Sequence, residues 1–273
     1  LAGQTSCDDA DAGHYIDQTG QSSQTPCPIG TYQSLAGQTS CENAYAGYYV
    51  DQVGQSNETP CPIGTYNPNM GATNVSACVD ADSGYYIDQT GQSSQTPCPV
   101  GTYQSLAGQT SCDDASAGYY VDQVGQSNET PCSVGTYNPN NGATSSSSCA
   151  DADSGYYVGQ TGQSNQTLCS IGTYQPYSSQ SSCNDADAGY YVDQIGQTSQ
   201  IACPVGTYQS ENGQASCSNA ELGYYVEQTS QSSQTPCPVG AYQTEMGQTS
   251  CDNADPGYYV DSLLGVGQSS QNS

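Results

Sequence analysis

The sequence contains no Lys, Arg, Phe or Trp, and it has a single His, His14. Its 26 acidic residues therefore give a formal net charge of −26. A chain without basic side chains lacks the electrostatic attraction by which proteins bind nucleic acids or anionic membrane surfaces. The carboxylates must be solvated or screened by salt and cations, and their mutual repulsion favours an extended, soluble chain. The lack of Lys and Arg also predicts resistance to trypsin.

Aliphatic side chains are scarce as well. The hydrophobic fraction of 34% includes 15 Cys and 24 Tyr, so Ala, Val, Ile, Leu and Met make up only about a fifth of the chain. A typical globular domain has about 45–50% apolar residues, so this chain has too little apolar surface to order one large core. No apolar run reaches the length of a transmembrane helix, and no signal peptide is recognisable. Because the chain starts inside a repeat, we interpret it as a piece of a longer or processed protein.

Internal repetition dominates the residues that are present. The string Leu-Ala-Gly-Gln-Thr-Ser-Cys begins at Leu1, Leu35 and Leu106. The motif Gly-Tyr-Tyr, once Gly-His-Tyr, recurs every 34 or 37 residues, beginning at Gly13, Gly47, Gly84, Gly118, Gly155, Gly189, Gly223 and Gly257. We therefore predict one tandem array of about eight units. Their boundaries are 1–26 (partial), 27–60, 61–97, 98–131, 132–168, 169–202, 203–236 and 237–273 (partial).

Each unit contains two related halves, such as Gly30 to Cys41 and Gly47 to Cys61. In both, Gly-x-Tyr is followed by Gly-Gln-(Ser/Thr) and then by Cys. Tyr, Val and Ile favour strands, and Gly supplies the positive φ of tight turns. The predicted fold is an elongated, disulfide-rich tandem-repeat rod that is mostly β and irregular. It has short strands and turns, no helices and no single globular core. Each half is expected to be ordered by stacking on its neighbours. We expect the second Tyr of each pair, such as Tyr49, to pack, and the first, which His14 replaces as a surface substitution, to lie nearer solvent.

The regular cysteines indicate an oxidising compartment and disulfide bonds. A constant long gap, as from Cys7 to Cys27, alternates with a short gap, as from Cys27 to Cys41 or from Cys61 to Cys78, so two pairings are compatible with the sequence. Pairing across the long gaps leaves Cys251 alone. Pairing across the short gaps leaves Cys7 alone. Its partner would then lie before Leu1, outside the segment. The alternative is a bond from Cys7 to a neighbouring subunit. The short-gap pairing, which we favour, joins Cys27–Cys41, Cys61–Cys78, Cys98–Cys112, Cys132–Cys149, Cys169–Cys183, Cys203–Cys217 and Cys237–Cys251.

The string Cys-Pro-x-Gly-Thr-Tyr-Gln followed by Gly-Gln-Thr-Ser-Cys resembles the ephrin-receptor-like cysteine-rich repeat, also called the GCC2/GCC3 repeat. That repeat is similar in pattern to the modules of tumour-necrosis-factor receptors and to EGF-like arrays. Clear copies run from Cys27 to Cys41, Cys98 to Cys112, Cys203 to Cys217 and Cys237 to Cys251, the last with Ala241 in place of Thr. The resemblance implies elongated extracellular modules with first-to-second cysteine pairing, which supports the short gaps. The family's Cys-x-x-Cys between modules is reduced to one cysteine here, so the family's second disulfide is lost.

Four Asn-x-Ser/Thr sequons are candidate N-glycosylation sites in a secreted chain. Three of them occupy the same place in the repeat, just before the cysteine of the Gly-Tyr-Tyr half. Ser and Thr crowd the same loops, so O-linked glycans are a further expectation. The alternative is that these loops are polar turns without glycans. The candidate sites are Asn57, Asn74, Asn128 and Asn165.

The pattern Asp-x-Asp-x-Gly follows several cysteines and is a candidate Ca²⁺ site, since it brings carboxylate oxygens close together in sequence. The alternative is an Asx turn, because the position two residues after Cys7 and after the second cysteine of every short gap is Asp or Asn. The position four residues after Cys changes to Tyr45 and Ser116 in other units, which would disrupt a ligand set. The candidate ligands are Asp9, Asp11, Asp17, Asp80, Asp82, Asp88, Asp151, Asp153, Asp185 and Asp187.

No arrangement of residues predicts an active site. His14 is the only imidazole base, and no Lys or Arg is present to hold an oxyanion or phosphate. We therefore predict a non-enzymatic, extracellular or cell-surface structural glycoprotein without a cofactor. It would form a stalk, fibre or surface-appendage filament from copies of itself, without nucleic-acid binding or direct membrane insertion. The alternative is the ectodomain spacer of a receptor or adhesin that binds a protein or glycan ligand, and a third hypothesis is a Ca²⁺-stiffened spacer.

Overall fold

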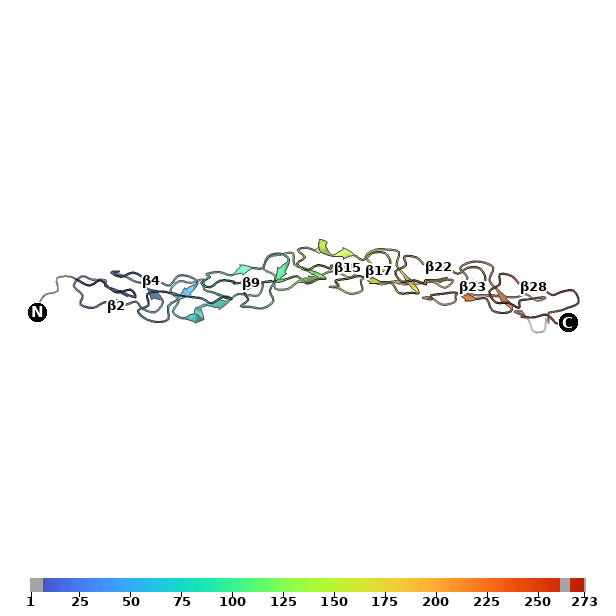
Figure 1. Ribbon diagram of the computed structural model, residues 1–273, viewed down its shortest axis with the longest axis horizontal. Helices are drawn as coiled ribbons and strands as arrows, with labels where there is room; N and C mark the ends of the chain where they lie inside the picture. Colours follow the sequence, from blue (N-terminus) through green and yellow to red (C-terminus); the bar gives the residue numbers. More distant parts are fainter. Residues whose placement is uncertain (1–6, 261–265, 273) are drawn as a thin grey trace. The chain divides into compact units, whose positions relative to one another are not determined.

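The structure, a computed structural model, describes residues 7–260 and 266–272. The chain divides into two compact units, Leu1–Thr130 with Asn140–Ser148, and Pro131–Pro139 with Cys149–Ser273. Within each unit, two-residue strands follow one another in chain order, and each odd-numbered strand pairs antiparallel with the next strand (Figure 1). The prediction of short strands and turns without one large core is confirmed.

Each strand is two residues long. Those of the first unit are β1 (His14–Tyr15), β2 (Thr25–Pro26), β3 (Thr31–Tyr32), β4 (Glu42–Asn43), β5 (Tyr48–Tyr49), β6 (Thr59–Pro60), β7 (Thr65–Tyr66), β8 (Val79–Asp80), β9 (Tyr85–Tyr86), β10 (Thr96–Pro97), β11 (Thr102–Tyr103), β12 (Asp113–Asp114) and β13 (Tyr119–Tyr120). β14 (Thr130–Pro131) lies where the chain leaves that unit. Those of the second unit are β15 (Thr136–Tyr137), β16 (Ala150–Asp151), β17 (Tyr156–Tyr157), β18 (Thr167–Leu168), β19 (Thr173–Tyr174), β20 (Asn184–Asp185), β21 (Tyr190–Tyr191), β22 (Ile201–Ala202), β23 (Thr207–Tyr208), β24 (Ser218–Asn219), β25 (Tyr224–Tyr225), β26 (Thr235–Pro236), β27 (Ala241–Tyr242) and β28 (Asp252–Asn253).

The structural repeat is a short coil that runs from one buried Cys or Ala to the next, as from Cys27 to Ala44, and contains one strand pair. Cysteine coils begin at Cys27, Cys61, Cys98, Cys132, Cys169, Cys203 and Cys237. Alanine coils alternate with them and begin at Ala10, Ala44, Ala81, Ala115, Ala152, Ala186 and Ala220. The coils of Cys61 and Cys132 carry a short insertion, and there the described chain forms its two 3-10 turns, η1 (Val75–Ala77) and η2 (Ser146–Ser148).

The register of the coils differs from the alignment of the two sequence halves. That alignment matched Cys41 with Cys61, because both follow Gly-Gln-(Ser/Thr). In the structure, β6 pairs with β5 immediately before Cys61, whereas β4 pairs with β3 immediately before Ala44. Cys61 is therefore equivalent to Ala44, and Cys41 is equivalent to Glu58. The two cysteines of each short gap thus have different structural roles.

A tight turn starts every coil. In the Cys27 coil the Thr31 N–H donates to the Pro28 carbonyl at 3.0 Å. Gly30 is the third residue of this turn and has φ +80°, a conformation that L side chains rarely adopt. This requirement explains why Gly-x-Tyr is the motif that recurs along the chain.

Consecutive coils within a unit are joined by three backbone hydrogen bonds. From the Cys27 coil, Gly30 N–H donates to Val50 O at 2.8 Å and Gln33 N–H donates to Gln55 O at 3.3 Å. In return, Gly54 N–H donates to Cys27 O at 2.8 Å. The same bonds recur from coil to coil, so each coil is ordered by its neighbours, as in other quasi-one-dimensional repeat proteins.

The buried residue of each strand pair is the one that follows the aromatic. Val50, Val121 and Val192 are fully buried, whereas Tyr49 is only half-buried, like Tyr48 before it. The second Tyr packs as expected, but the residue after it is the more deeply buried one. Both Tyr rings cover the coil edge, while the next residue in the strand points into the narrow interior.

Cysteine coils place an amide at this buried position. Gln33 is 5% exposed, and its Nε2 donates to Ser40 O at 2.9 Å while its Oε1 accepts from Leu35 N–H at 3.1 Å. In the longer Cys61 coil, Asn67 is 0% exposed and its Nδ2 donates to the Tyr48 carbonyl. These amides fill the core and satisfy backbone groups, so the fold needs few aliphatic residues.

Two serines take a backbone conformation that is reserved for glycine elsewhere in the chain. Ser179 and Ser230 have φ of 60° and 62° at the position where other coils have Gly, such as Gly37 at 74°. A non-glycine residue in this region costs about 1 kcal/mol. We expect Ser179→Gly and Ser230→Gly each to stabilise their coil by about 0.5–1 kcal/mol, measured as slower local hydrogen exchange. Ser178→Gly is the matched control and should not stabilise; equal protection in all three variants would contradict the prediction.

Candidate functional site

Seven disulfides close the cysteine coils. They are the pairs of the short-gap scheme: Cys27–Cys41, Cys61–Cys78, Cys98–Cys112, Cys132–Cys149, Cys169–Cys183, Cys203–Cys217 and Cys237–Cys251. In each, a fully buried cysteine at the start of a coil bonds a half-buried cysteine on the returning chain. Each bridge therefore ties the two sides of one coil together and leaves the alanine coils without a covalent link.

Cys7 is exposed and has no partner among the described residues. It occupies the register position of Cys41, whose partner lies 14 residues earlier in the chain. Its pairing outside the segment stays a prediction.

Alanine coils carry a hydrogen-bonded clamp where cysteine coils carry the disulfide. In the Ala81 coil the Asp82 N–H donates to Gln95 Oε1 at 2.7 Å, and Gln95 Nε2 donates to the Asp82 carboxylate at 2.7 Å. Gln95 stands at the position that Cys112 occupies in the next coil, and Ala81 stands at that of Cys98. Two polar bonds thus replace the covalent bond in this alanine coil.

The clamp is repeated with small variations in both units. Asp and Gln form it in the pairs Asp11–Gln24, Asp82–Gln95, Asp153–Gln166, Asp187–Gln200 and Asp255–Gln271, and Glu replaces Asp in Glu221–Gln234. Where Tyr45 or Ser116 replaces the acid, Glu58 or Glu129 replaces the Gln and accepts the backbone N–H at 2.6 Å. Sequence reasoning missed these Gln residues, although their recurrent place shortly before the cysteine was a usable signal.

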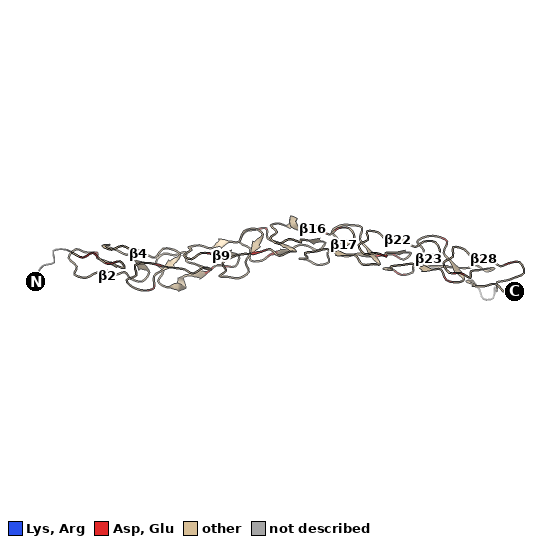
Figure 2. Ribbon diagram, in the orientation of Figure 1, with Lys and Arg blue, Asp and Glu red and all other residues tan. Residues whose placement is uncertain are grey.

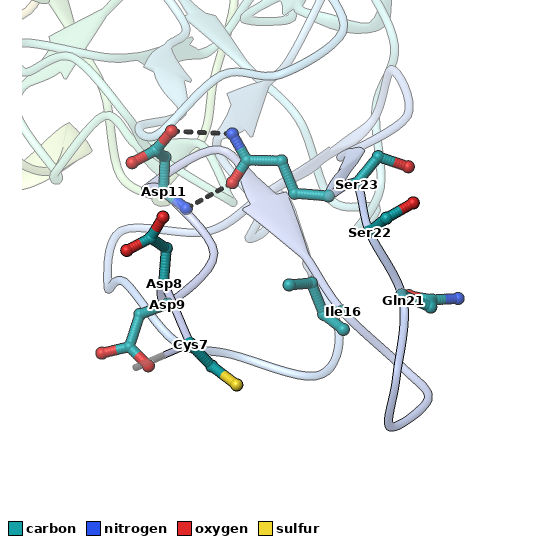
Figure 3. A pocket seen from close by; sticks show the side chains of 9 residues that line it. Cys7, Asp8, Asp9, Asp11, Ile16, Gln21, Ser22 and Ser23 are labelled. Atoms are coloured by element: carbon teal, nitrogen blue, oxygen red, sulfur yellow. Dashed lines mark hydrogen bonds between the residues drawn. The ribbon is translucent and has the colours of Figure 1, made fainter. Parts of the chain in front are cut away.

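The structure separates the carboxylates that were candidate Ca²⁺ ligands. Asp11 faces the amide of Gln24, and in Figure 3 its carboxylate points away from that of Asp9. Asp17 accepts a bond from Gln21 at 3.1 Å. Within residues 7–260 and 266–272, no group of three or more acidic, Cys or His side chains is arranged to hold a metal ion.

The remaining candidate ligands also have different surroundings from one another. Asp82, Asp153 and Asp187 are clamp residues. Asp80 and Asp185 each lie beside a glycine of the cysteine coil in the following repeat, Gly108 and Gly213, where a Cβ would come within 3.3 Å of the Asp80 carboxyl carbon and 3.6 Å of that of Asp185. Asp88 and Asp151 are exposed. These positions assign the Asp-x-Asp pattern to coil closure and coil-to-coil packing.

All four sequon asparagines lie on the surface. Asn57, Asn128 and Asn165 are exposed in equivalent loops of alanine coils, one residue before the clamp residue. Asn74 is exposed in the insertion of the Cys61 coil, where its Oδ1 accepts from Ser76 N–H at 2.9 Å and caps η1. Glycosylation takes place on Nδ2, so this cap is compatible with an attached glycan.

Acidic residues are distributed along both units without a basic counterpart (Figure 2). The depression shown in Figure 3 is lined by Cys7, Asp8 and Asp9 and by short polar side chains, and it is open to solvent. It brings together no base and nucleophile in the arrangement that covalent catalysis needs.

One tyrosine in the cysteine coils is strongly resistant to ionisation. Partial burial raises the pKa of Tyr32 to about 12, and the nearby carboxylates of Glu58 and Glu42 oppose the phenolate further. Burial followed by neighbouring carboxylates also raises the pKa of Tyr103, Tyr174 and Tyr242. The folded chain therefore retains phenol protons that the unfolded chain releases above about pH 10.

These shifts predict alkaline destabilisation. Since the folded pKa lies above the unfolded value, the contribution of these phenols to stability is constant below about pH 10 and falls as the pH rises from 10 towards 12. We expect Glu58→Gln to lower the pKa of Tyr32, because it removes a carboxylate while keeping the Gln that forms the clamp elsewhere. Tyrosinate absorbance and urea unfolding between pH 9 and 12 would measure this in a Cys7→Ser background, which prevents thiol exchange. An unchanged titration in Glu58→Gln would contradict the assigned cause.

A row of exposed aliphatic side chains occupies the starting turns of the cysteine coils. The residues are Ile29, Ile63, Val100, Val134, Ile171, Val205 and Val239, each 44–59% exposed. The corresponding turn residues of the alanine coils are mostly Ala or Ser. These aliphatic residues contribute little to the interior, and they are the most regular apolar feature of the surface.

Comparison with known proteins bears on this architecture. Residues 84–129 match the family described as tyrosine-protein kinase ephrin type A/B receptor-like. No curated protein shows a significant sequence match to this chain. In the described part of the chain, no helix has the length and apolar character needed to cross a bilayer.

The matched residues contain one complete bridge, Cys98–Cys112, and parts of the alanine coils on either side of it. Domains of this kind are not catalytic, and together with the disulfides they indicate an extracellular or secreted repeat protein. Residues 84–129 thus match an ephrin-receptor-like cysteine-rich repeat, and a similar disulfide-bonded unit recurs along the chain as an array.

Proposed function

We propose that the chain is a structural element of an extracellular stalk, fibre or surface appendage. The observation that carries this proposal is the uniform coil ladder, in which the same three backbone bonds recur from coil to coil. A binding or catalytic centre confined to one place on the array requires one repeat to diverge, whereas here disulfides and clamps alternate without a specialised coil. Stacked coils that contact only coils close to them in the chain provide length at a low demand for apolar residues.

Covalent glycans fit this role. The sequon asparagines are exposed, and three of them occupy the same position in the repeat, so glycans would attach to equivalent loops of the array. Asn57→Gln and Asn128→Gln are each expected to reduce the mass of the secreted chain by one N-glycan. Asn43→Gln, which changes an exposed Asn outside any sequon, is the control. Equal masses for all three variants would show that these sequons are unoccupied.

Assembly of copies into a filament depends on screening of their negative charge by salt. Chains of net charge −26 repel one another, and salt shortens the range of that repulsion to about 8 Å at physiological ionic strength. Lateral association is therefore expected to strengthen as NaCl concentration rises, measured by sedimentation velocity. Association that weakens with salt would contradict apolar contact between copies.

Protein binding as a receptor or adhesin spacer is the second candidate. An exposed aliphatic residue recurs at the starting turn of each cysteine coil and favours it, because exposed apolar side chains can contact an apolar partner surface. Cryo-electron microscopy of the unreduced native material separates the two candidates. Ordered filaments built from this chain would support the fibre, and isolated chains joined to another ectodomain would support the spacer.

A further inference from the structure

The seven disulfides divide the chain into two kinds of segment that alternate. Bridged loops span 14 or 17 residues, as between Cys27 and Cys41 or between Cys61 and Cys78. Connecting segments run from the second cysteine of one bridge to the first of the next, as from Cys41 to Cys61, and all have the same length. A pulling force along the chain therefore passes through each bridge and through each connecting segment, and it bypasses each bridged loop.

Connecting segments contain nearly all of an alanine coil and are held only by noncovalent contacts. In the segment from Cys41 to Cys61, Gly54 N–H donates to the Cys27 carbonyl at 2.8 Å and Tyr45 N–H donates to Glu58 at 2.6 Å. Val50 is its buried aliphatic residue. Such bonds exchange with water when the coil opens, so the segment unravels while the neighbouring bridges stay intact.

We propose that the array is an extensible tether with a covalent stop in every repeat. Under tension the alanine coils open and lengthen the chain, whereas the cysteine coils cannot lengthen because their two sides are bonded. The alternation of clamp and disulfide is the structural basis of this difference. The use of the tether in a stalk or fibre rests on the proposed function, but the mechanical behaviour belongs to the chain alone.

The geometry sets the lengths. An extended chain spans about 3.3–3.6 Å per residue, so a connecting segment such as Cys41 to Cys61 reaches about 65–70 Å. Each bridged loop adds only the 5.6–5.8 Å between its Cα atoms. Reduction should release about 40–45 Å for a 14-residue loop and about 50–55 Å for a 17-residue loop.

Optical-tweezers extension of the full chain tests the proposal, with handles joined to peptide tags at both ends in a Cys7→Ser background. The oxidised chain should lengthen by opening of its connecting segments and then reach a limit. Treatment with a phosphine reductant should move that limit outward by the increments above. Each bridge takes two electrons from the phosphine and two protons to give two thiols, and the phosphine becomes its oxide with oxygen from water.

Paired variants assign the increments to particular bridges. Oxidised Cys98→Ser with Cys112→Ser should gain about 40–45 Å, and Cys61→Ser with Cys78→Ser should gain about 50–55 Å, relative to the unaltered chain. An identical limit with and without phosphine would overturn the proposal, and this measurement needs only the Cys7→Ser background. Increments of about 60–65 Å would also overturn it, since they correspond to bridges across the long gaps. If the increments appear but the native material is neither stalk nor fibre, the tether stands and the proposed function fails.

Discussion

Gly47→Ala should destabilise the coils around it by about 4 kcal/mol, the sum of backbone strain and steric overlap. A Cβ at Gly47 would lie 2.1 Å from the carbonyl oxygen of Gly91, which belongs to the alanine coil of the following repeat. Gly47 also has φ +93°, so the new side chain adds backbone strain of about 1–2 kcal/mol to an overlap worth about 1–3 kcal/mol. The backbone of Gly91 cannot move aside without breaking the bond from its N–H to the Cys61 carbonyl at 2.9 Å. Hydrogen exchange should show lost protection in both alanine coils.

Gly240→Ala is the matched control for this prediction. Gly240 has φ +90°, yet no described atom lies within 4 Å of the position that its Cβ would take. The control therefore adds the backbone strain alone, about 1–2 kcal/mol. Equal losses of protection in the two variants would show that coils of successive repeats do not pack through their glycine backbones.

Ala81→Cys together with Gln95→Cys should form an eighth disulfide. Ala81 and Gln95 occupy in an alanine coil the positions that Cys98 and Cys112 occupy in the next coil, where the Cα atoms are 5.8 Å apart. The new bridge would close a loop of about 15 residues, which stabilises by about 3 kcal/mol in the chain-entropy model, less the clamp that it replaces. We expect no new free thiol by thiol titration, and a higher denaturant midpoint for the surrounding coils.

Gln95→Ala measures the clamp by itself. It removes the two 2.7 Å bonds to Asp82 and should destabilise the Ala81 coil by about 1 kcal/mol, since both groups are partly solvated. Asp88→Asn, an exposed change in the same coil, should have almost no effect on stability.

The double-cysteine variant, Ala81→Cys with Gln95→Cys, tests the equivalence of clamp and disulfide directly. Two titratable thiols in that variant would contradict this equivalence.

Much of the fold follows from local residue chemistry. Gly-x-Tyr recurs because Gly30 and its equivalents must take positive φ in a turn, and the residues after it favour a short strand. Disulfide pairing across the short gaps was predicted together with a competing scheme, and the structure forms all seven short-gap bridges. The choice was supported by a family resemblance, because spacing alone permits both closures.

Other features escaped prediction because they depend on pairing between distant residues. The matching of Cys61 with Ala44 is set by strand register, whereas Gly-Gln-(Ser/Thr) precedes a cysteine in both halves and suggests a different match. The clamp joins residues 13 positions apart through two polar bonds, so its Asp residues were interpreted as calcium ligands or turn residues instead. The interior position of Val50 was missed because Tyr49 is the larger apolar group, while strand geometry directs the next side chain inward.

By itself the sequence determined a tandem, disulfide-bonded and acidic array of short strands without one large core. Composition, turn glycines and cysteine periodicity act locally, and they require no knowledge of which coil contacts which. Only the tertiary structure decided where each coil begins and ends, the three bonds between consecutive coils and the alternation of disulfide and clamp. These features depend on residues of neighbouring coils meeting in space, because one coil buries too little surface to be ordered alone.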